Sequence, residues 1–156
     1  TVGPCELPDI FNTLNEARGT ISAFERARSM SWEWHNHRDR LSDGFAATLE
    51  KGWAIALDDY VAAQHLASQC RHTFARVMAD FDVLLTASAS GEAPEGLSST
   101  GDFTFQGLWT MLHVPAISLP THGGPSGLPV GVQLVGRAGA DDALISAAGW
   151  AWDKLG

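Results

Sequence analysis

The sequence has few lysines and no long hydrophobic run, and each absence excludes a class of protein. Of the 156 residues only Lys51 and Lys154 are lysines, and the formal net charge is −8. A nucleic-acid-binding surface needs clustered Lys and Arg, so no nucleic-acid partner is expected. No apolar stretch approaches the roughly 20 residues of a membrane-spanning helix, so no membrane association is expected either.

Cysteine is equally scarce, and its two occurrences, Cys5 and Cys70, form no Cys-x-x-Cys pair. Two distant cysteines are more typical of reduced thiols than of a disulfide framework. The first residues carry neither the basic start nor the apolar core of a secretory signal. We therefore expect a cytoplasmic protein whose length suits one hydrophobic core.

Apolar residues spaced three and four apart predict helices through much of residues 9–80. The first helix begins after Asp9, and a break is expected at Gly19 because glycine weakens a helix interior. A short helix follows from Ser42 to Lys51, with Gly52 as the left-handed residue beyond its end. Residues 29–41 show no clean period and are left unassigned.

The longest helix is predicted to run from Asp58 to Asp80. Its predicted apolar face includes Val61, Leu66, Phe74, Val77, Met78 and Phe81, with small alanines helping the packing. A last helix is predicted to begin at Asp141. Its predicted apolar face consists of Leu144, Ile145, Ala148 and Trp152.

Three short apolar runs predict strands near residues 83–86, 116–119 and 130–135. The stretch between the second and third runs is shorter than the dozen or so residues of a helical crossover, so these strands should pair antiparallel. Between the first and second runs, a long polar loop leads into a short helix that ends before Pro115. The sequence therefore predicts an α/β fold.

Two motifs invite a functional reading, and in both cases a plain structural reading is preferred. His35, His37 and Asp39 lack a partner group at metal-ligand spacing, so they are interpreted as surface residues and no metal site is assigned. Gly-Gly-Pro-Ser-Gly at 123–127 lacks the lysine and the spacing of a phosphate-binding loop, and is interpreted as a hairpin loop. No cofactor is expected.

A nucleophile with its base is not recognisable in the sequence. There is no Gly-x-Ser-x-Gly turn. The serines of the long loop are Ser88, Ser90, Ser98 and Ser99, and none has an evident base within reach. Neither lysine stands where it could activate one of them. No catalytic residue is assigned.

Asp102 stands at the end of the long loop, immediately before the short helix. A carboxylate at a helix start is favoured by the helix dipole, so a capping role is the simpler interpretation. Lining a ligand pocket is the alternative, and the two roles are compatible.

Three segments together resemble the C-terminal part of amidase-signature enzymes. They are FDVLLTASASGEAP (81–94), TGDFTFQGLWTMLHVPAISLP (100–120) and GLPVGVQLVGR (127–137). Their order and gaps match the family, and GLPVGVQLVG is the most specific piece. The resemblance implies a mixed β-sheet flanked by helices, of which this chain forms part.

The same resemblance implies hydrolysis of a carboxylic amide to an acid and ammonia or an amine, through a Ser–cis-Ser–Lys triad and an acyl-enzyme. The family's serines lie in a loop of the Gly-Gly-Ser-Ser-Gly-Gly type, which this sequence lacks. We therefore expect residues 1–156 to form one partial domain, the C-terminal third of an amidase, inactive by itself. Its expected partners are a small-molecule amide and the missing N-terminal catalytic segment.

The match has departures. Ala87 stands where a proline often follows the first strand, and His113 stands where glycine is usual, so packing near Trp109 should differ from the family. In amidotransferase members a carboxylate just before this helix contacts the substrate amine, and Asp102 is its nearest equivalent, about one residue out of register.

The resemblance gives a set of candidate substrate-binding residues, which would form one wall of the acyl pocket. They are Asp102, Phe103, Phe105, Trp109 and Thr110. For Phe105 and Trp109 a role in the hydrophobic core is an equal alternative. The rival hypothesis for the whole chain is a non-catalytic module that has a structural or partner-binding role. Association with further copies of the chain is left open.

Overall fold

The protein, seen here in a computed structural model that describes residues 2–155, divides into two compact units. One unit is helical and consists of residues 9–70. The other contains the sheet and consists of the residues up to Pro8 together with those from Arg71 onward. The prediction of one domain stays a prediction, and each unit is described by itself.

The helical unit follows the predicted periodicity and fills the stretch that was left unassigned. Its elements are η1 (Asp9–Thr13), α1 (Leu14–Ser29), α2 (Ser31–Asn36), η2 (Arg38–Arg40), α3 (Asp43–Ala54) and the first part of α4 (Leu57–Val77). Helix α1 buries one face, with Leu14, Ile21 and Phe24 at the three- and four-residue spacing that predicted a helix here. The expected break at Gly19 is wrong, because α1 continues through it.

The prediction for Gly52 is also wrong, and the reason is packing between α1 and α3. Ser42 does cap α3, accepting the Phe45 N–H at 3.4 Å, but the helix runs past Gly52 to Ala54. Gly52 is buried, and a Cβ at this position would overlap the Ala23 carbonyl of α1. Glycine is therefore required here by close approach and not by a left-handed turn.

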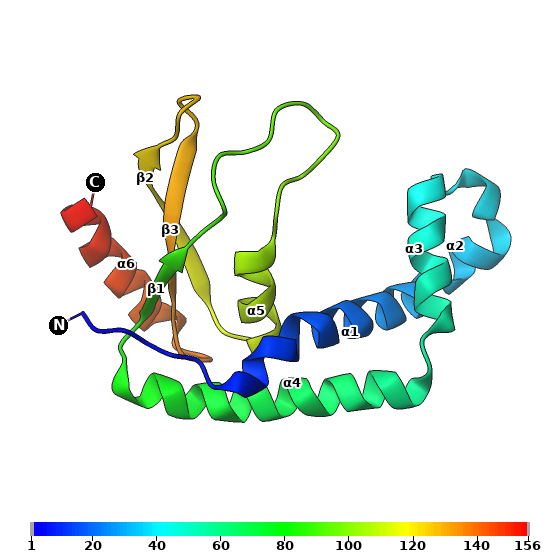
Figure 1. The fold of residues 1–156 in the computed structure, drawn as a ribbon, viewed down its shortest axis with the longest axis horizontal. Coiled ribbons are helices and arrows are strands. Elements are labelled where there is room, and N and C mark those ends of the chain that lie inside the picture. Colours follow the sequence, from blue (N-terminus) through cyan, green and yellow to red (C-terminus); the bar gives the residue numbers. More distant parts are fainter. Residues whose placement is uncertain (1, 156) are drawn as a thin grey trace. The chain divides into compact units, whose positions relative to one another are not determined.

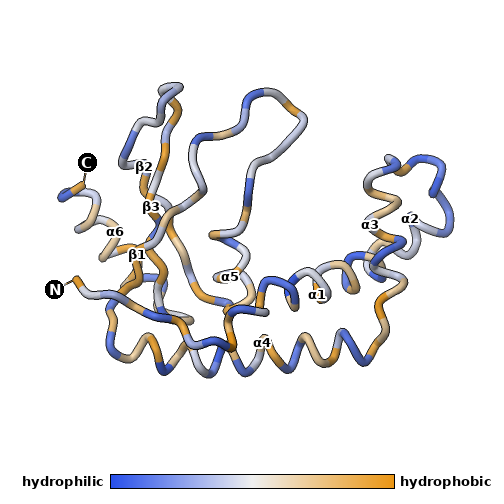
Figure 2. Tube along the Cα trace, in the orientation of Figure 1, coloured by the Kyte–Doolittle hydropathy of each residue, from blue (hydrophilic) through white to orange (hydrophobic). Residues whose placement is uncertain are grey.

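The buried face of α4 differs in part from the predicted one. The helix begins at Leu57, ends at Val77 and is followed by η3 (Met78–Asp80). The fully packed residues lie at helical spacing and are mostly small: Ala63, Ala67, Cys70, Phe74 and Met78. Val61, predicted on this face, is exposed. Figure 2 shows hydrophobic and hydrophilic residues alternating along α4, as one buried face requires.

The second unit is built on a three-stranded sheet with the order β1-β3-β2, antiparallel throughout. Its strands are β1 (Leu84–Ala87), β2 (Ala116–Gly123) and β3 (Pro129–Val135). The α/β fold, the three strands and the antiparallel hairpin are thus confirmed (Figure 1). Strand β2 extends beyond the predicted range because Pro120 is tolerated on an edge strand, where the pairing register shifts between Leu119 and His122.

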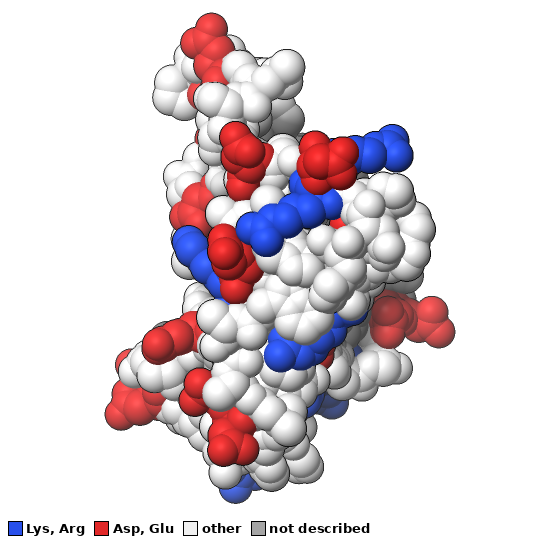
Figure 3. All heavy atoms as spheres, turned by 90° about the vertical axis from the view of Figure 1, so that its right-hand side faces the viewer, with Lys and Arg blue, Asp and Glu red and all other residues white. Residues whose placement is uncertain are grey.

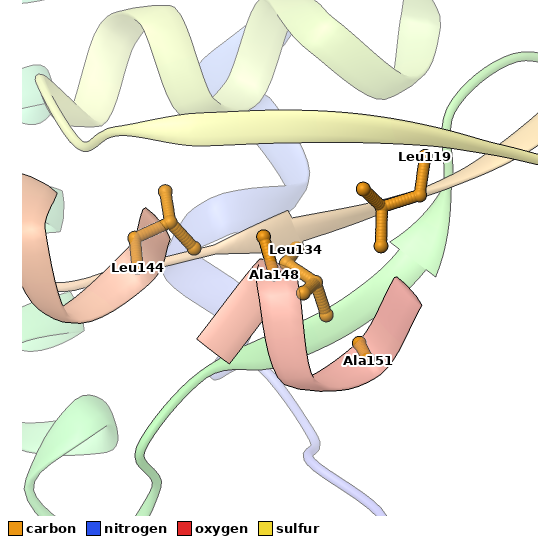
Figure 4. Close-up of a cluster of buried hydrophobic side chains, with 5 residues drawn as sticks. All are labelled: Leu119, Leu134, Leu144, Ala148 and Ala151. Atoms are coloured by element: carbon orange, nitrogen blue, oxygen red, sulfur yellow. The ribbon is translucent and has the colours of Figure 1, made fainter. Parts of the chain in front are cut away.

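Helix α6 (Asp141–Leu155) packs on one face of this sheet. The shared core is drawn in Figure 4 and consists of Leu119, Leu134, Leu144, Ala148 and Ala151. The predicted face of α6 is wrong for Ile145 and Trp152, which are exposed. Alanines at 148 and 151 let the helix approach the strands closely, so the contact runs along the small residues.

Three further features of the described residues concern the charged side chains, the two cysteines and the hydropathy of the helices. Side chains of both signs are mixed on the face drawn in Figure 3. No disulfide joins Cys5 to Cys70. Within residues 2–155, no helix is long and apolar enough to cross a membrane.

We expect Gly52→Ala to lower the free energy of unfolding by about 2 kcal/mol, because its methyl group would meet the Ala23 carbonyl. Chemical denaturation measures the effect. The matched control is Gly19→Ala in α1, which has no atom within 4 Å of its added Cβ. That change should raise stability by up to about 1 kcal/mol through helix propensity. Two changes of the same sign would contradict this account.

Candidate functional site

The five predicted site residues lie in one continuous segment, at the end of the long loop and along α5 (Thr104–Leu112). This helix belongs to the sheet unit and buries Trp109, Met111 and Leu112. It is seen beside the sheet in Figure 1. The segment is therefore the place to look for the predicted pocket wall.

Asp102 organises the start of α5. Its Oδ1 accepts the backbone N–H of Thr104 at 2.9 Å and the Thr104 hydroxyl at 2.6 Å. The hydroxyl bond, followed by the backbone bond, holds the pKa of the Asp102 carboxyl below its ordinary value. The formal cap position is Phe103, so Asp102 satisfies the first helical N–H from one residue further out. Its carboxylate is exposed.

The other four predicted residues divide between two sides of α5. Phe103 and Thr110 are exposed, with 59% of Phe103 accessible. Phe105 is half-buried and Trp109 is buried, its ring 5.8 Å from that of Phe74. The Trp109 indole N–H has no hydrogen-bond partner within residues 2–155. Phe103 and Thr110 thus face outward, and Phe105 and Trp109 lie on the inner side of the same segment.

A residue that sequence reasoning missed, Gln133 of the central strand, fixes α5 to the sheet. It is the buried polar residue of the described core, at 4% exposure. Its Nε2 donates to the Ala87 carbonyl at 3.0 Å and to the Phe105 carbonyl at 2.9 Å. The signal for it was a single amide side chain inside an otherwise apolar strand.

Beside this bridge, two serines meet across the central strand. The hydroxyls of Ser88 and Ser118 are 2.5 Å apart, and the Gln106 amide donates to the Ser88 carbonyl. The central strand has Gly131 here, where a Cβ would lie 3.2 Å from the Ser88 hydroxyl. The partner of each hydroxyl is another hydroxyl and not a His or Lys base. Within residues 2–155 the pair is described as a polar contact between β2 and the residue that follows β1.

Glu92, in the middle of the long loop, was also missed. Its carboxylate accepts the backbone N–H groups of Ser126 and Leu128 in the β2–β3 turn, each at 2.9 Å. Partial burial acts to raise its pKa, but these hydrogen bonds outweigh burial and hold the pKa of Glu92 below its ordinary value. The segment 123–127, interpreted as a hairpin loop, is confirmed as the turn between β2 and β3.

The C-terminal end of α5 explains the departure at His113. This residue adopts a left-handed conformation with φ of 55°, which allows the chain to end α5 in a Schellman motif. The His113 N–H donates to the Thr110 carbonyl at 3.3 Å, and the Val114 N–H to that of Trp109 at 3.4 Å. Glycine is favoured at such a position, and the imidazole fits because it is exposed and lies 3.5 Å from an Arg71 nitrogen.

A pocket of about 250 Å³ lies near the same end of α5, away from the predicted wall. It is lined by Phe74, Met78 and Leu112 with the side chains of Arg71 and Arg137. Both guanidinium groups are engaged: Arg71 donates to the Met111 carbonyl, and Arg137 to those of Met78 and Phe81. None of the five predicted residues lines this pocket, so it is not the predicted acyl pocket.

The histidines considered as metal ligands have other neighbours. His35 Nδ1 is 2.7 Å from the Ser31 carbonyl, and the ring of His37 packs edge-on against Trp32. Among residues 2–155, no group of three or more His, Cys, Asp or Glu side chains could hold a metal ion.

The low pKa of Asp102 gives a titration test. Because its folded-state pKa lies below the unfolded value, the carboxylate stabilises the fold at neutral pH, and this contribution is lost as the pH falls through the folded pKa. Thr104→Val removes the largest cause, so the Asp102 carboxyl pKa followed by NMR should rise toward that of an ordinary aspartate. Thr100→Val, the same change in the exposed loop, should leave it unchanged. An unaltered titration in Thr104→Val would contradict the assignment.

The Amidase family profile matches residues 9–145. Among curated proteins, the chain is 30% identical over 102 residues to a fatty acid amide hydrolase of Medicago truncatula, covering 58% of this chain and 17% of that protein. It is 26% identical over 141 residues to a glutamyl-tRNA(Gln) amidotransferase subunit of Brevibacillus brevis, covering 86% of this chain and 28% of that one.

Solved structures give the same answer for the fold. A crystal structure of an amidase superposes with a TM-score of 0.81 at 25% identity, over 94% of this chain and 36% of that chain. A 6-aminohexanoate cyclic dimer hydrolase superposes with a TM-score of 0.79 at 18% identity, over 96% and 37%. The chain thus spans about a third of the length of these structures. With the profile covering most of its residues, the chain belongs to the Amidase family.

Proposed function

We propose that this chain forms the C-terminal part of an amidase that hydrolyses a carboxylic amide to an acid and ammonia or an amine. The nucleophile and base would be a Ser–cis-Ser–Lys triad supplied by residues outside this sequence. The observation that carries the proposal is the superposition of 94% of the chain on 36% of a solved amidase, at 25% identity. The names of the curated relatives, an amide hydrolase and an amidotransferase subunit, support chemistry at an amide carbonyl.

The role proposed for the described residues is to form one wall of the acyl pocket. Phe103 and Thr110 point away from the core and would contact substrate, and Asp102 at the helix start would meet a polar group. Phe105 and Trp109 would hold this surface from behind, and the Trp109 N–H is a donor that an acceptor from outside these residues could use. The spacing along the segment supports this division: Phe103 and Thr110 are about two helical turns apart on one side, and Phe105 and Trp109 are about one turn apart on another.

The proposed function is tested by comparing the complete reading frame that contains this sequence with residues 1–156 alone. Both proteins are purified and assayed for ammonia or amine release from a panel of aliphatic, aryl and fatty-acyl amides. We expect hydrolysis by the complete product and none by residues 1–156. Hydrolysis by residues 1–156 alone would contradict the proposal that the triad lies elsewhere. No hydrolysis by either protein would favour the non-catalytic module instead.

The wall is tested by Phe103→Ala in the complete product. Loss of the ring should lower kcat/KM for an amide with an apolar acyl group by about tenfold, equivalent to about 1.4 kcal/mol. The matched control is Ile145→Ala on α6, because Ile145 is 61% exposed against 59% for Phe103. It should leave kcat/KM unchanged. Equal effects of the two changes would refute the proposed wall.

A further inference from the structure

The long loop of residues 88–103 contacts the β2–β3 turn through one side chain, that of Glu92. Its Oε1 accepts the N–H groups of Ser126 and Leu128 at 2.9 Å, and its Oε2 accepts that of Ser126 at 3.0 Å. Between them, Gly127 has a φ of 82°. Successive N–H groups in such a turn point into one concavity, which is the geometry that binds anions. The loop thus supplies the carboxylate that this concavity holds.

The turn has room for Glu92 because residue 124 is glycine. A Cβ added to Gly124 would overlap the Cγ and Cδ atoms of Glu92. The overlapped atoms belong to the far part of a flexible side chain, so a methyl group at this position would displace Glu92 without breaking the turn. By contrast, a Cβ at Gly123 would meet no atom within 4 Å. The neighbouring glycine therefore provides a matched comparison.

Glu92 is connected through the loop to the start of α5. Two residues on, Pro94 lies against Gly101, with its Cδ 3.4 Å from where a Gly101 Cβ would be. The Gly101 N–H donates to the Ser99 hydroxyl at 3.1 Å, and the next residue, Asp102, holds the first turn of α5. The two limbs of the loop therefore meet just before the helix.

We propose that Glu92 is a positioning residue that locks the long loop to the β2–β3 turn and so fixes the segment leading into α5. Without this lock, the hydrogen bonds described above hold the loop at Ser88 and at Asp102, with residues 89–101 between them. With it, that stretch is divided into residues 89–91 and residues 93–101. The lock concerns the conformation of the loop and does not depend on amide hydrolysis by the protein.

The first test replaces the carboxylate and then returns it. In the product of the complete reading frame, Glu92→Ala should speed amide hydrogen exchange in peptides covering residues 124–128 by about tenfold, because the N–H groups of Ser126 and Leu128 lose their charged acceptor. Acetate should slow exchange again by entering the vacated concavity, and chloride at equal ionic strength should not. Glu95→Ala, three residues along the same loop, should leave exchange unchanged.

The second test leaves Glu92 in place and fills its space. Gly124→Ala should speed exchange in residues 124–128 as Glu92→Ala does, because the displaced carboxylate no longer accepts their N–H groups, and Gly123→Ala should not. Unchanged exchange in Glu92→Ala, failure of acetate to slow it, or equal behaviour of the two glycine variants would each overturn the proposal. Because exchange is the readout, these outcomes stand apart from any result on amide hydrolysis.

Discussion

The arrangement of the sheet unit depends on one buried amide, that of Gln133 in the central strand. Burying an amide in an apolar core is costly unless its groups are hydrogen-bonded, and both bonds donated by Gln133 go to backbone carbonyls. One carbonyl belongs to Ala87 at the end of β1, and the other to Phe105 in the first turn of α5. A single side chain thus sets where the first strand ends and where the helix lies.

The two hydrogen bonds of Gln133 also determine the course of the long loop, because they bring both ends of the loop to the same place on the sheet. The beginning is held where Ser88 meets Ser118 and donates its N–H to the Gly131 carbonyl at 3.0 Å. The end is held where Asp102 binds Thr104. A loop of this length inside a compact unit is usually functional, and here the residues proposed for substrate contact stand at its end.

Sequence periodicity predicted the strands and the longer helices, but it missed α2 and gave faces that were partly wrong. Short apolar runs predicted all three strands, and the short connection predicted the antiparallel hairpin, since both depend only on local spacing. The faces of α4 and α6 were partly wrong because large apolar residues such as Val61 and Trp152 were included in them, whereas much of the buried surface belongs to alanines. Close packing selects small residues wherever two elements approach, and periodicity alone does not show which elements will approach.

The helix that carries the candidate site residues was predictable from the sequence, but the contacts that anchor this helix and its loop were not. The family resemblance located the segment from Asp102 to Thr110, and the structure places those residues on one helix and the turn before it. Gln133 and Glu92 could not be assigned from the sequence, because their partners lie 28 to 46 residues away and are backbone groups. Nearly every residue carries a backbone N–H and a carbonyl, whatever its type, so a sequence pattern does not show which of these groups a side chain will bind.

That same feature bears on how the fold tolerates change in sequence. Gln133, Glu92 and Asp102 all bind backbone groups, which are present whatever the side chain at the partner position is. Exposed residues such as Phe103 and Thr110 can be exchanged without altering these bonds. Structures with 18% to 25% identity to this chain superpose with TM-scores of 0.79 to 0.81, so the fold is kept although most side chains differ. Contacts to backbone groups are compatible with such divergence, because a change of residue type at the partner position leaves the bonded atom in place.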